Sequence, residues 1–460
     1  MKNCPVNPHR ISPLNDASVK DGKYVLYWIQ QSQRAEFNHA LEYAVFMANQ
    51  LRLPLLAAFG LMPDYPDANL RHYRFMLEGL RDLEDDLHQR GIKFVLRLGQ
   101  PADIASELAQ SASMVVCDRG YLRHQKQWRQ QLADDAACRV VQIESEVIVP
   151  VEIASQKQEY AARTIRPKLH AVYEPYLHQL PEVQLEKPSL DLGVEGLILS
   201  SDWRKIEDRL QFNKSVAPVD NLFSGGTAAA RKVFTDFLKN RVQNYEAHRN
   251  QPQTNDVSHM AKYLHFGQIS PVWLLLEAGK QTTADDENLA SFTEELLVRR
   301  ELAMNYVENT DNYDQYTALP EWAQTTLDEH RDDPREYQYS VEQLENSQTH
   351  DDYWNAAMME MVNTGYMHNY MRMYWGKKIL EWTDLPEEAF ARTLHLNNKY
   401  FLDGRDPVSF ASVSWLFGRH DRPWKERPIF GKIRYMSSKG LKRKCDIDSY
   451  VAKVQKTQPL

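Results

Sequence analysis

The sequence predicts an α/β N-terminal domain built on a doubly wound parallel sheet, followed by an all-α C-terminal domain. Between residues 23 and 145, short runs rich in β-branched residues alternate with segments of helical length, which is typical of parallel strands joined by right-handed crossovers. Two runs, 53–59 and 113–118, are apolar throughout, as expected when helices cover both faces of a sheet. Beyond residue 225, long segments show helical periodicity with few chain breakers.

The first domain is expected to alternate strands with helices. The predicted strands cover 23–29, 53–61, 92–99, 113–118 and 138–144, and the predicted helices cover 37–51, 71–91 and 102–110. Gly91 stands at the end of the charged second helix, where a glycine commonly forms the cap.

Three ranges follow from this pattern: an α/β domain at 20–150, an inter-domain linker at 151–224 and a helical domain at 225–460. Within the linker, the stretch from 180 to 224 has several prolines and few periodic apolar positions. We therefore expect it to follow an irregular path across the surface. The main helical segments of the second domain are 287–307 and 350–382.

Composition indicates a globular cytoplasmic protein. The 460 residues are 43% hydrophobic, yet no apolar run approaches the roughly 20 residues that cross a bilayer, and the polar start lacks a signal peptide's apolar core. The four cysteines are scattered, without the spacing of a zinc site. We expect reduced thiols and no metal.

Charge is unevenly distributed along the chain. The net charge is −8, but the segment from Arg419 to Lys444 is strongly basic and has aromatic residues between its charges. Such a basic stripe is typical of surfaces that contact nucleic acid. The sequence has no glycine-rich phosphate loop and no Gly-x-Ser-x-Gly elbow, so neither an NTPase nor a simple hydrolase is predicted.

Three tryptophans occur in the helical segment 350–382. Trp375 and Trp382 are seven residues apart, hence on one helix face and separated by about 10.5 Å of rise, and Trp354 lies in the preceding run. Tryptophans at helical spacing usually pack in a core. The same spacing also suits electron hopping between indoles, and the pattern does not separate the two interpretations.

Two charged constellations also have two interpretations each. Asp403 follows the amide pair Asn397–Asn398. The segment is typical of an ordinary turn. Alternatively, Asp403 is a buried carboxylate that pairs with Arg372, and the planar guanidinium lies against a flat redox ring. In EELLVRREL, Glu295 and Arg299 are four apart, which indicates either a surface salt bridge or groups that bind a base and phosphates.

The segment SWLFGRHDRPW adds exposed aromatics next to arginines. Trp415, Arg422 and Trp424 stand at the start of the basic stripe, where stacking on bases would contribute about 1–3 kcal/mol per base. Packing in a core is the alternative interpretation.

Several strings, taken together and in order, resemble the photolyase and cryptochrome superfamily, specifically the class II cyclobutane pyrimidine dimer (CPD) DNA photolyases. They are YWIQQSQRAEFNHAL, SQKQEYAARTIRPKLH, YLHFGQISP, EELLVRRELA, THDDYWNAAMMEMV, MHNYMRMYWGKKILEW, LNNKYFLDGRDP, and HDRPW followed by FGKIRYM. The resemblance extends from Lys23 to Tyr450. It implies an N-terminal antenna domain, a helical domain that binds FAD, and light-driven repair of pyrimidine dimers in double-stranded DNA.

The resemblance also implies roles for individual residues. The implied FAD contacts are Tyr245, Ser258, His259, Met260, Arg372, Asp403 and Asn397, with Asn397 facing flavin N5. The implied photoreduction chain is Trp375, Trp354 and Trp382, in that order outward from the flavin. Glu295 and Trp415 match groups at the lesion. The implied contacts to DNA are Arg299, Arg300, Arg422, Trp424, Lys432 and Arg434.

Some points stay open. Family members usually have Ser at the position of Ala261 and often Pro at that of Lys262, so Lys262 could replace a lost phosphate contact with charge. A deazaflavin or folate antenna is expected near Trp28, Arg34 and Asn38, with an empty pocket as the alternative. We expect a monomer, associated with the nucleoid if the organism is prokaryotic.

Three rival functions remain. A cryptochrome-like photoreceptor would signal without repairing DNA, and a (6-4) photoproduct photolyase would need a histidine at the lesion, with His259, His265 and His420 unplaced. A nucleotide-binding α/β protein without light chemistry would leave the residues after about 150 without an explanation.

Overall fold

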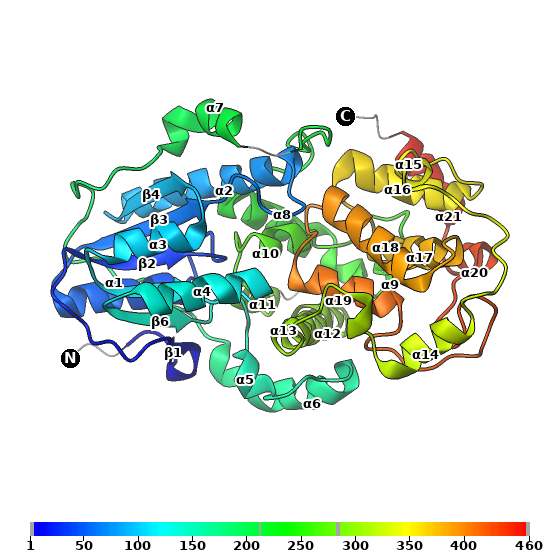
Figure 1. The fold of residues 1–460 in the computed structure, drawn as a ribbon, viewed down its shortest axis with the longest axis horizontal. Coiled ribbons are helices and arrows are strands. Elements are labelled where there is room, and N and C mark those ends of the chain that lie inside the picture. The colour runs from blue at the N-terminus through cyan, green and yellow to red at the C-terminus, as the bar shows by residue number, and fades with distance from the viewer. Residues whose placement is uncertain (1–3, 211–212, 282–285, 457–460) are drawn as a thin grey trace.

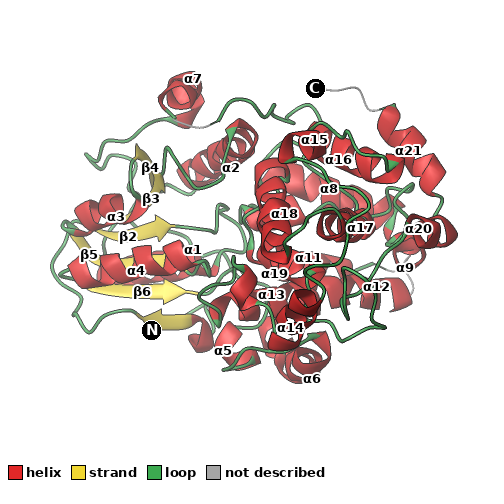
Figure 2. Ribbon diagram, turned by 45° about the vertical axis from the view of Figure 1, so that its right-hand side comes forward, coloured by secondary structure: helices red, strands yellow, loops and turns green. Residues whose placement is uncertain are grey.

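The predicted fold class is confirmed in a computed structural model, which describes residues 4–210, 213–281 and 286–456. A six-stranded sheet flanked by helices lies beside a large helical region (Figure 1; Figure 2). No helix within the described ranges is long and apolar enough to cross a membrane.

The sheet has the strand order β1-β6-β5-β2-β3-β4. All neighbouring strands pair in parallel except β1 and β6. The strands are β1 (Ile11–Pro13), β2 (Tyr24–Ile29), β3 (Leu55–Leu61), β4 (Lys93–Leu98), β5 (Ala112–Asp118) and β6 (Arg139–Ile143). Every residue of β2, β3 and β5 is buried, which agrees with the apolar runs in the sequence.

Helices cover both faces of this sheet. Apolar side chains of α1 (His39–Leu51) and α2 (Leu70–Gln89) pack on one face, and those of α3 (Pro101–Ala109) and α4 (Arg123–Asp135) pack on the other. The sequence did not predict the helix α4. Only two of its apolar residues, Leu132 and Ala133, are buried, which is too few for a clear helical pattern.

The segment between the sheet and the helical region is less irregular than the sequence suggested. It contains α5 (Val151–Ala154), α6 (Ala162–Val172) and, within the proline-rich stretch, α7 (Leu199–Arg209). Leu199 and Ile206 of α7 pack against α2, so this helix is stabilised by burial that its short apolar pattern did not reveal. The chain returns over the α/β domain here (Figure 1).

The helical region surrounds the candidate site. Its helices are α8 (Thr227–Asn240), α9 (Tyr245–His248), α10 (Ala261–His265), α11 (Pro271–Ala278), α12 (Asp286–Thr293), α13 (Arg300–Glu308), α14 (Glu321–Glu329), α15 (Val341–Glu345), α16 (Asp352–Thr364), α17 (Asn369–Glu381), α18 (Pro386–Tyr400), α19 (Pro407–Leu416), α20 (Ser438–Lys444) and α21 (Ile447–Gln455). A π-helical turn, Glu294–Arg299, joins α12 to α13. Gly365 adopts a left-handed conformation, which separates α16 from α17.

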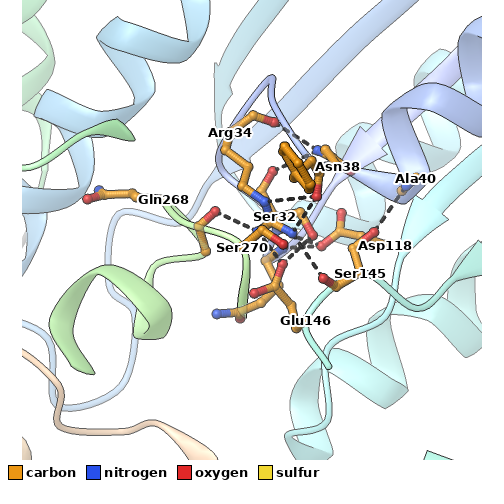
Figure 3. Close-up of polar contacts among 12 residues, drawn as sticks. Ser32, Arg34, Asn38, Ala40, Asp118, Ser145, Glu146, Gln268 and Ser270 are labelled. Carbon is orange, nitrogen blue, oxygen red and sulfur yellow. Dashed lines mark hydrogen bonds and ion pairs between the residues drawn. The ribbon is translucent and has the colours of Figure 1, made fainter. Parts of the chain in front are cut away.

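A buried polar cluster joins the two regions (Figure 3). Arg34 Nη1 donates to Glu146 Oε1 at 2.6 Å and to the Gly267 carbonyl at 2.8 Å. Nearby, Asp118 accepts hydrogen bonds from three successive backbone amides, those of residues 30–32. Because the Arg34–Glu146 pair is almost fully buried, breaking it on one side would leave an unpaired charge in the interior.

Arg71 of α2 forms a second connection between the regions. Its side chain is 1% exposed and has no carboxylate partner among the described residues. Instead it donates to four backbone carbonyls, those of Ala217, Met361, Val362 and Tyr400. One guanidinium therefore fixes the ends of α16 and α18 to the α/β domain.

Candidate active site

Two cavities adjoin each other inside the helical region. Cavity A, of about 360 Å³, is lined by residues that include Arg299, Arg372, Trp375, Asn397, Trp415 and His420. Cavity B, of about 170 Å³, is lined by residues that include Tyr245, Ser258, Met260, Ala261, Asp403 and Asp406. Glu295 and Arg299 line both, so the two spaces meet at the π-helical turn.

The predicted pairing of Arg372 with Asp403 is confirmed at this junction. Two parallel hydrogen bonds of 2.9 Å join the guanidinium of α17 to the carboxylate that follows α18. Burial opposes ionisation of Asp403, but the charge of Arg372 outweighs it and lowers the pKa below its usual value. The guanidinium also stacks on Phe401, 3.9 Å from the ring centroid. The pair presents a fixed, flat and charged surface.

Asn397 reaches the wall of cavity A from α18. Its Nδ2 donates to Ser409 Oγ at 2.7 Å and to Asn398 Oδ1 at 3.0 Å, which fixes the orientation of the amide. No described group donates to Oδ1 of Asn397. The side chain is therefore held rigidly with its carbonyl oxygen free to accept a hydrogen bond.

The three tryptophans form a continuous path from cavity A. Trp375 lines the cavity, Trp354 Nε1 donates to the Trp375 carbonyl at 2.9 Å, and the rings of Trp354 and Trp382 are 5.5 Å apart, edge to face. Trp354 and Trp382 line neither cavity A nor cavity B. The order along the path is Trp375, Trp354, Trp382.

The π-helical turn changes the pairing expected in EELLVRREL. Glu295 does not pair with Arg299, as helical spacing suggested, but with Arg249, whose Nη2 lies 2.7 Å from Oε1. Arg299 instead pairs with Glu294 at 3.3 Å and lies over the Trp415 ring, 5.3 Å from its centroid. A π turn brings residues five apart, not four, onto one face.

Comparison with known proteins places the chain among photolyases. Residues 25–186 match the family described as DNA photolyase. A deoxyribodipyrimidine photo-lyase of Methanothermobacter thermautotrophicus is 49% identical over 453 residues, which cover 98% of this chain and 99% of that protein. The chain belongs to the DNA photolyase family. It is an enzyme of that family with the family's fold.

More distant relatives agree. The deoxyribodipyrimidine photo-lyase of Potorous tridactylus is 39% identical and is matched over 93% of this chain and 81% of its own length. Among solved structures, a class III photolyase of Agrobacterium tumefaciens superposes with a TM-score of 0.74 at 19% identity, over 95% of this chain and 87% of that one. A cryptochrome of Synechocystis gives 0.70 at 15% identity, over 93% and 87%. At such identities the structures support the fold alone.

Of the residues expected at the flavin, only His259 lines neither cavity, although it belongs to the turn that borders cavity B. Tyr245, Ser258, Met260 and Asp403 line cavity B, but His259 does not. Its Nε2 lies 2.8 Å from Asn255 Oδ1, and its ring packs against Tyr366.

The residues expected at DNA divide into exposed and buried positions. Trp424 is 40% exposed. The guanidinium groups of Arg422 and Arg434 lie 5.1 and 5.3 Å from its ring centroid, and Lys432 is exposed nearby. Arg300 is different. Its side chain is buried, lines cavity B and donates to the Glu146 carbonyl, so it does not lie on the exposed surface with Arg422, Trp424 and Lys432.

The expected antenna residues do not line a cavity together. Trp28 packs in the core beneath α3 and α4, whereas Arg34 and Asn38 belong to the cluster of Figure 3. A third cavity, cavity C, of about 90 Å³, opens instead among residues that include Gln30, Tyr65, Trp128, His265 and Arg405.

Sequence reasoning missed Arg249 and the orientation of Arg405. Arg249 meets Glu295 only through folding, because 46 residues separate them. Arg405 follows Asp403 closely but turns toward cavity C. No local pattern distinguishes either residue.

Proposed function

We propose that this chain is a class II CPD photolyase, which splits pyrimidine dimers in DNA in a light-driven reaction that depends on FAD. Relatives named deoxyribodipyrimidine photo-lyase, from 38% to 49% identical over most of the chain, support this proposal. The observation that carries it is the meeting of cavities A and B beside the Arg372–Asp403 pair, with Trp375 and Asn397 on the wall.

The residues around these cavities fit a flavin dinucleotide. A flat aromatic ring needs planar partners, which Arg372 and Trp375 provide, and an acceptor for a ring N–H, which Asn397 Oδ1 provides. The indole Nε1 atoms of Trp375 and Trp415, both on the wall of cavity A, are buried donors without a hydrogen-bond partner among the described residues. Unused buried donors are costly and fit a site that binds a polar ligand.

Each side chain then has a defined task. When bound, reduced FAD would supply an electron to the dimer on illumination and accept it back after the ring has split. Arg249 holds the Glu295 carboxyl group toward the shared space, where it can hydrogen-bond the pyrimidines. Trp415, stacked beneath Arg299, forms an apolar wall that excludes water.

Access to a buried flavin requires that the dimer leave the DNA helix. A lesion that pairs poorly costs less to extrude, which contributes to selectivity. The exposed Trp424 with its two arginines supplies a surface that can fill the gap, and Lys432 adds charge. Binding is expected to weaken steeply as salt rises, because phosphate contacts release counterions.

The central test is illumination of the purified protein with DNA that contains defined dimers. We expect flavin absorption bands in the protein as purified, and light-dependent conversion of CPD to intact pyrimidines, measured by chromatography. DNA containing the (6-4) photoproduct serves as the control substrate and should remain unchanged. Flavin bands without repair of either lesion would favour a photoreceptor and contradict the proposal.

The positions of the histidines argue against (6-4) repair, which needs a histidine that donates a proton. His420 lines cavity A, but burial lowers its pKa to about 4, so the ring is neutral. Its Nδ1 lies 2.9 Å from the Tyr160 carbonyl, which can only accept, so the proton is on Nδ1 and is engaged there. His265 lines cavity C, and His259 does not line cavity B.

We further propose the division of the chain into an antenna domain at 20–150, a connecting segment at 151–224 and an FAD domain at 225–460. Cavity C would hold the antenna, a deazaflavin or a folate. Its walls are mainly apolar and aromatic, with Arg405 at one side. Arg405 is 4% exposed, and its Nε and Nη2 have no partner among the described residues.

A substitution at Arg405 tests the antenna site. In Arg405→Met we expect the antenna band to be lost from the spectrum of the purified protein while the flavin bands stay, since a buried unpaired guanidinium should be balanced by an anionic part of the ligand. Arg405→Lys keeps the charge and should retain part of the band. Equal loss of antenna and flavin bands in Arg405→Met would show a general structural defect.

A further inference from the structure

Lys262 is a buried lysine without a carboxylate partner. Its side chain lies in α10 and is 3% exposed. The ammonium group is 3.8 Å from the ring centroid of Phe223 and 5.6 Å from that of Tyr366, and it donates to the His259 carbonyl at 3.1 Å. No described carboxylate lies within ion-pair distance of it. Aromatic faces and one carbonyl compensate only in part for lost hydration.

The charge of this ammonium is poorly balanced by its surroundings. Burial lowers the pKa of Lys262 to about 7; Asp403 raises it and Arg372 lowers it. Those two residues are already bonded to each other, so Asp403 offers little additional compensation. The site therefore lacks a negative charge.

Lys262 also fixes the turn that borders cavity B. Its neighbours Met260 and Ala261 line that cavity, as does Ser258. His259 has a φ of 58°, a left-handed conformation that is uncommon for residues other than glycine. The hydrogen bond from the Lys262 ammonium group to the His259 carbonyl stabilises this turn.

We propose that Lys262 provides the positive charge that balances the FAD diphosphate, through space and through the turn that it holds, and that it becomes protonated when FAD binds. The inference rests on the proposed FAD site. Lys262 acts as a positioning residue, since it does not line cavity B. An anion nearby favours the charged form of an amine, so binding of the diphosphate and uptake of a proton would be coupled.

The other ionisable groups around Lys262 do not titrate near neutral pH. Burial lowers the pKa of His259 well below its usual value and raises those of Tyr263 and Tyr366 above theirs, whereas the pKa of Asp403, opposed by burial, is lowered by Arg372. Elsewhere in the chain, burial also moves the pKa of Lys377 to about 7 and that of Glu301 to about 8, so a change of FAD affinity between pH 7 and 9 is attributed to Lys262 only where it disappears in a Lys262 variant.

The test measures release of FAD from the holoprotein on dilution, by flavin fluorescence, between pH 6.5 and 9. For the unchanged chain we expect the Kd to rise above pH 7 by up to about tenfold per pH unit, the limit for one coupled proton. Lys262→Met should bind FAD roughly tenfold more weakly at pH 6.5 and show no rise with pH. Lys239→Met, at an exposed position of α8, is the matched control and should behave like the unchanged chain.

A second variant and a second measurement keep the result unambiguous. Lys262→Arg stays charged over this range, so its Kd should be low and independent of pH even if Lys262→Met fails to fold. A pH-dependent Kd in Lys262→Arg or Lys262→Met would overturn the inference. The inference would also be overturned if Lys262→Met changed the midpoint potential of the flavin but left the pH dependence of FAD binding as in the unchanged chain. The charge of Lys262 would then act on the flavin ring and not on the diphosphate. A chain that binds no flavin would instead contradict the proposed function.

Discussion

Replacing Trp354 by phenylalanine is expected to abolish light-driven reduction of oxidised flavin while sparing repair by enzyme that was reduced chemically beforehand. Trp354 contacts both Trp375 and Trp382. It is therefore the indole that connects the inner and the outer tryptophan of the path. Phenylalanine fills most of the volume but is much harder to oxidise. In the proposed reaction, repair needs only the flavin and the dimer, so it should not depend on this path.

Two measurements separate these functions. Flavin absorbance under blue light with an external reductant reports photoreduction, and turnover of dimer-containing DNA under anaerobic conditions reports repair. Trp273→Phe, in α11 and outside the path, controls for the general effect of losing an indole. Parallel loss of photoreduction and repair in Trp354→Phe would contradict this separation.

Replacing Arg71 by methionine is expected to lower the free energy of unfolding by about 3–5 kcal/mol. The substitution leaves four carbonyls without their buried donor, and these belong to three separate segments, at Ala217, at Met361 and Val362, and at Tyr400. An unsatisfied buried carbonyl costs about 1–3 kcal/mol, partly recovered if water enters.

Urea denaturation followed by tryptophan fluorescence measures this change. Arg139→Met, at an exposed position of β6, is the control and should shift stability by less than about 0.5 kcal/mol. Since Arg71 binds both regions, its loss should also reduce retention of FAD. A stability change as small as that of Arg139→Met would show that water replaces the guanidinium at little cost.

The pattern of apolar residues along the sequence was sufficient to predict most of the strands and helices of the α/β domain. The strands β2 to β6 and the helices α1 to α3 have clear periodicity or continuous apolar runs, so their positions follow from the sequence. The strand β1 has only three residues, too few for a pattern, and α4 presents mostly polar residues. Both are held by tertiary contacts that a local search does not include.

Contacts in the site could be predicted where a buried charge requires a partner of opposite charge. They could not be predicted where they depend on the local geometry of a helix. A buried Asp403 needs a cationic partner, and Arg372 was the candidate; the ion pair is present. The partner of Glu295 could not be found, because EELLVRREL reads as an ordinary α-helix and gives no sign of a π turn. The roles of these residues toward FAD and DNA stay predictions.

The π turn at Glu294–Arg299 makes the site sensitive to the deletion of a single residue in this segment. A π turn contains one residue more than the α-helical turn it replaces, so deletion of a single codon within this stretch could restore a regular helix without introducing any unfavourable residue. Residues before the deletion would then rotate by about 100° relative to those after it. Glu294 would turn away from Arg299, and Glu295 would turn away from the cavities, while the fold survived. The constellation therefore depends on the count of residues in this segment as much as on their identity.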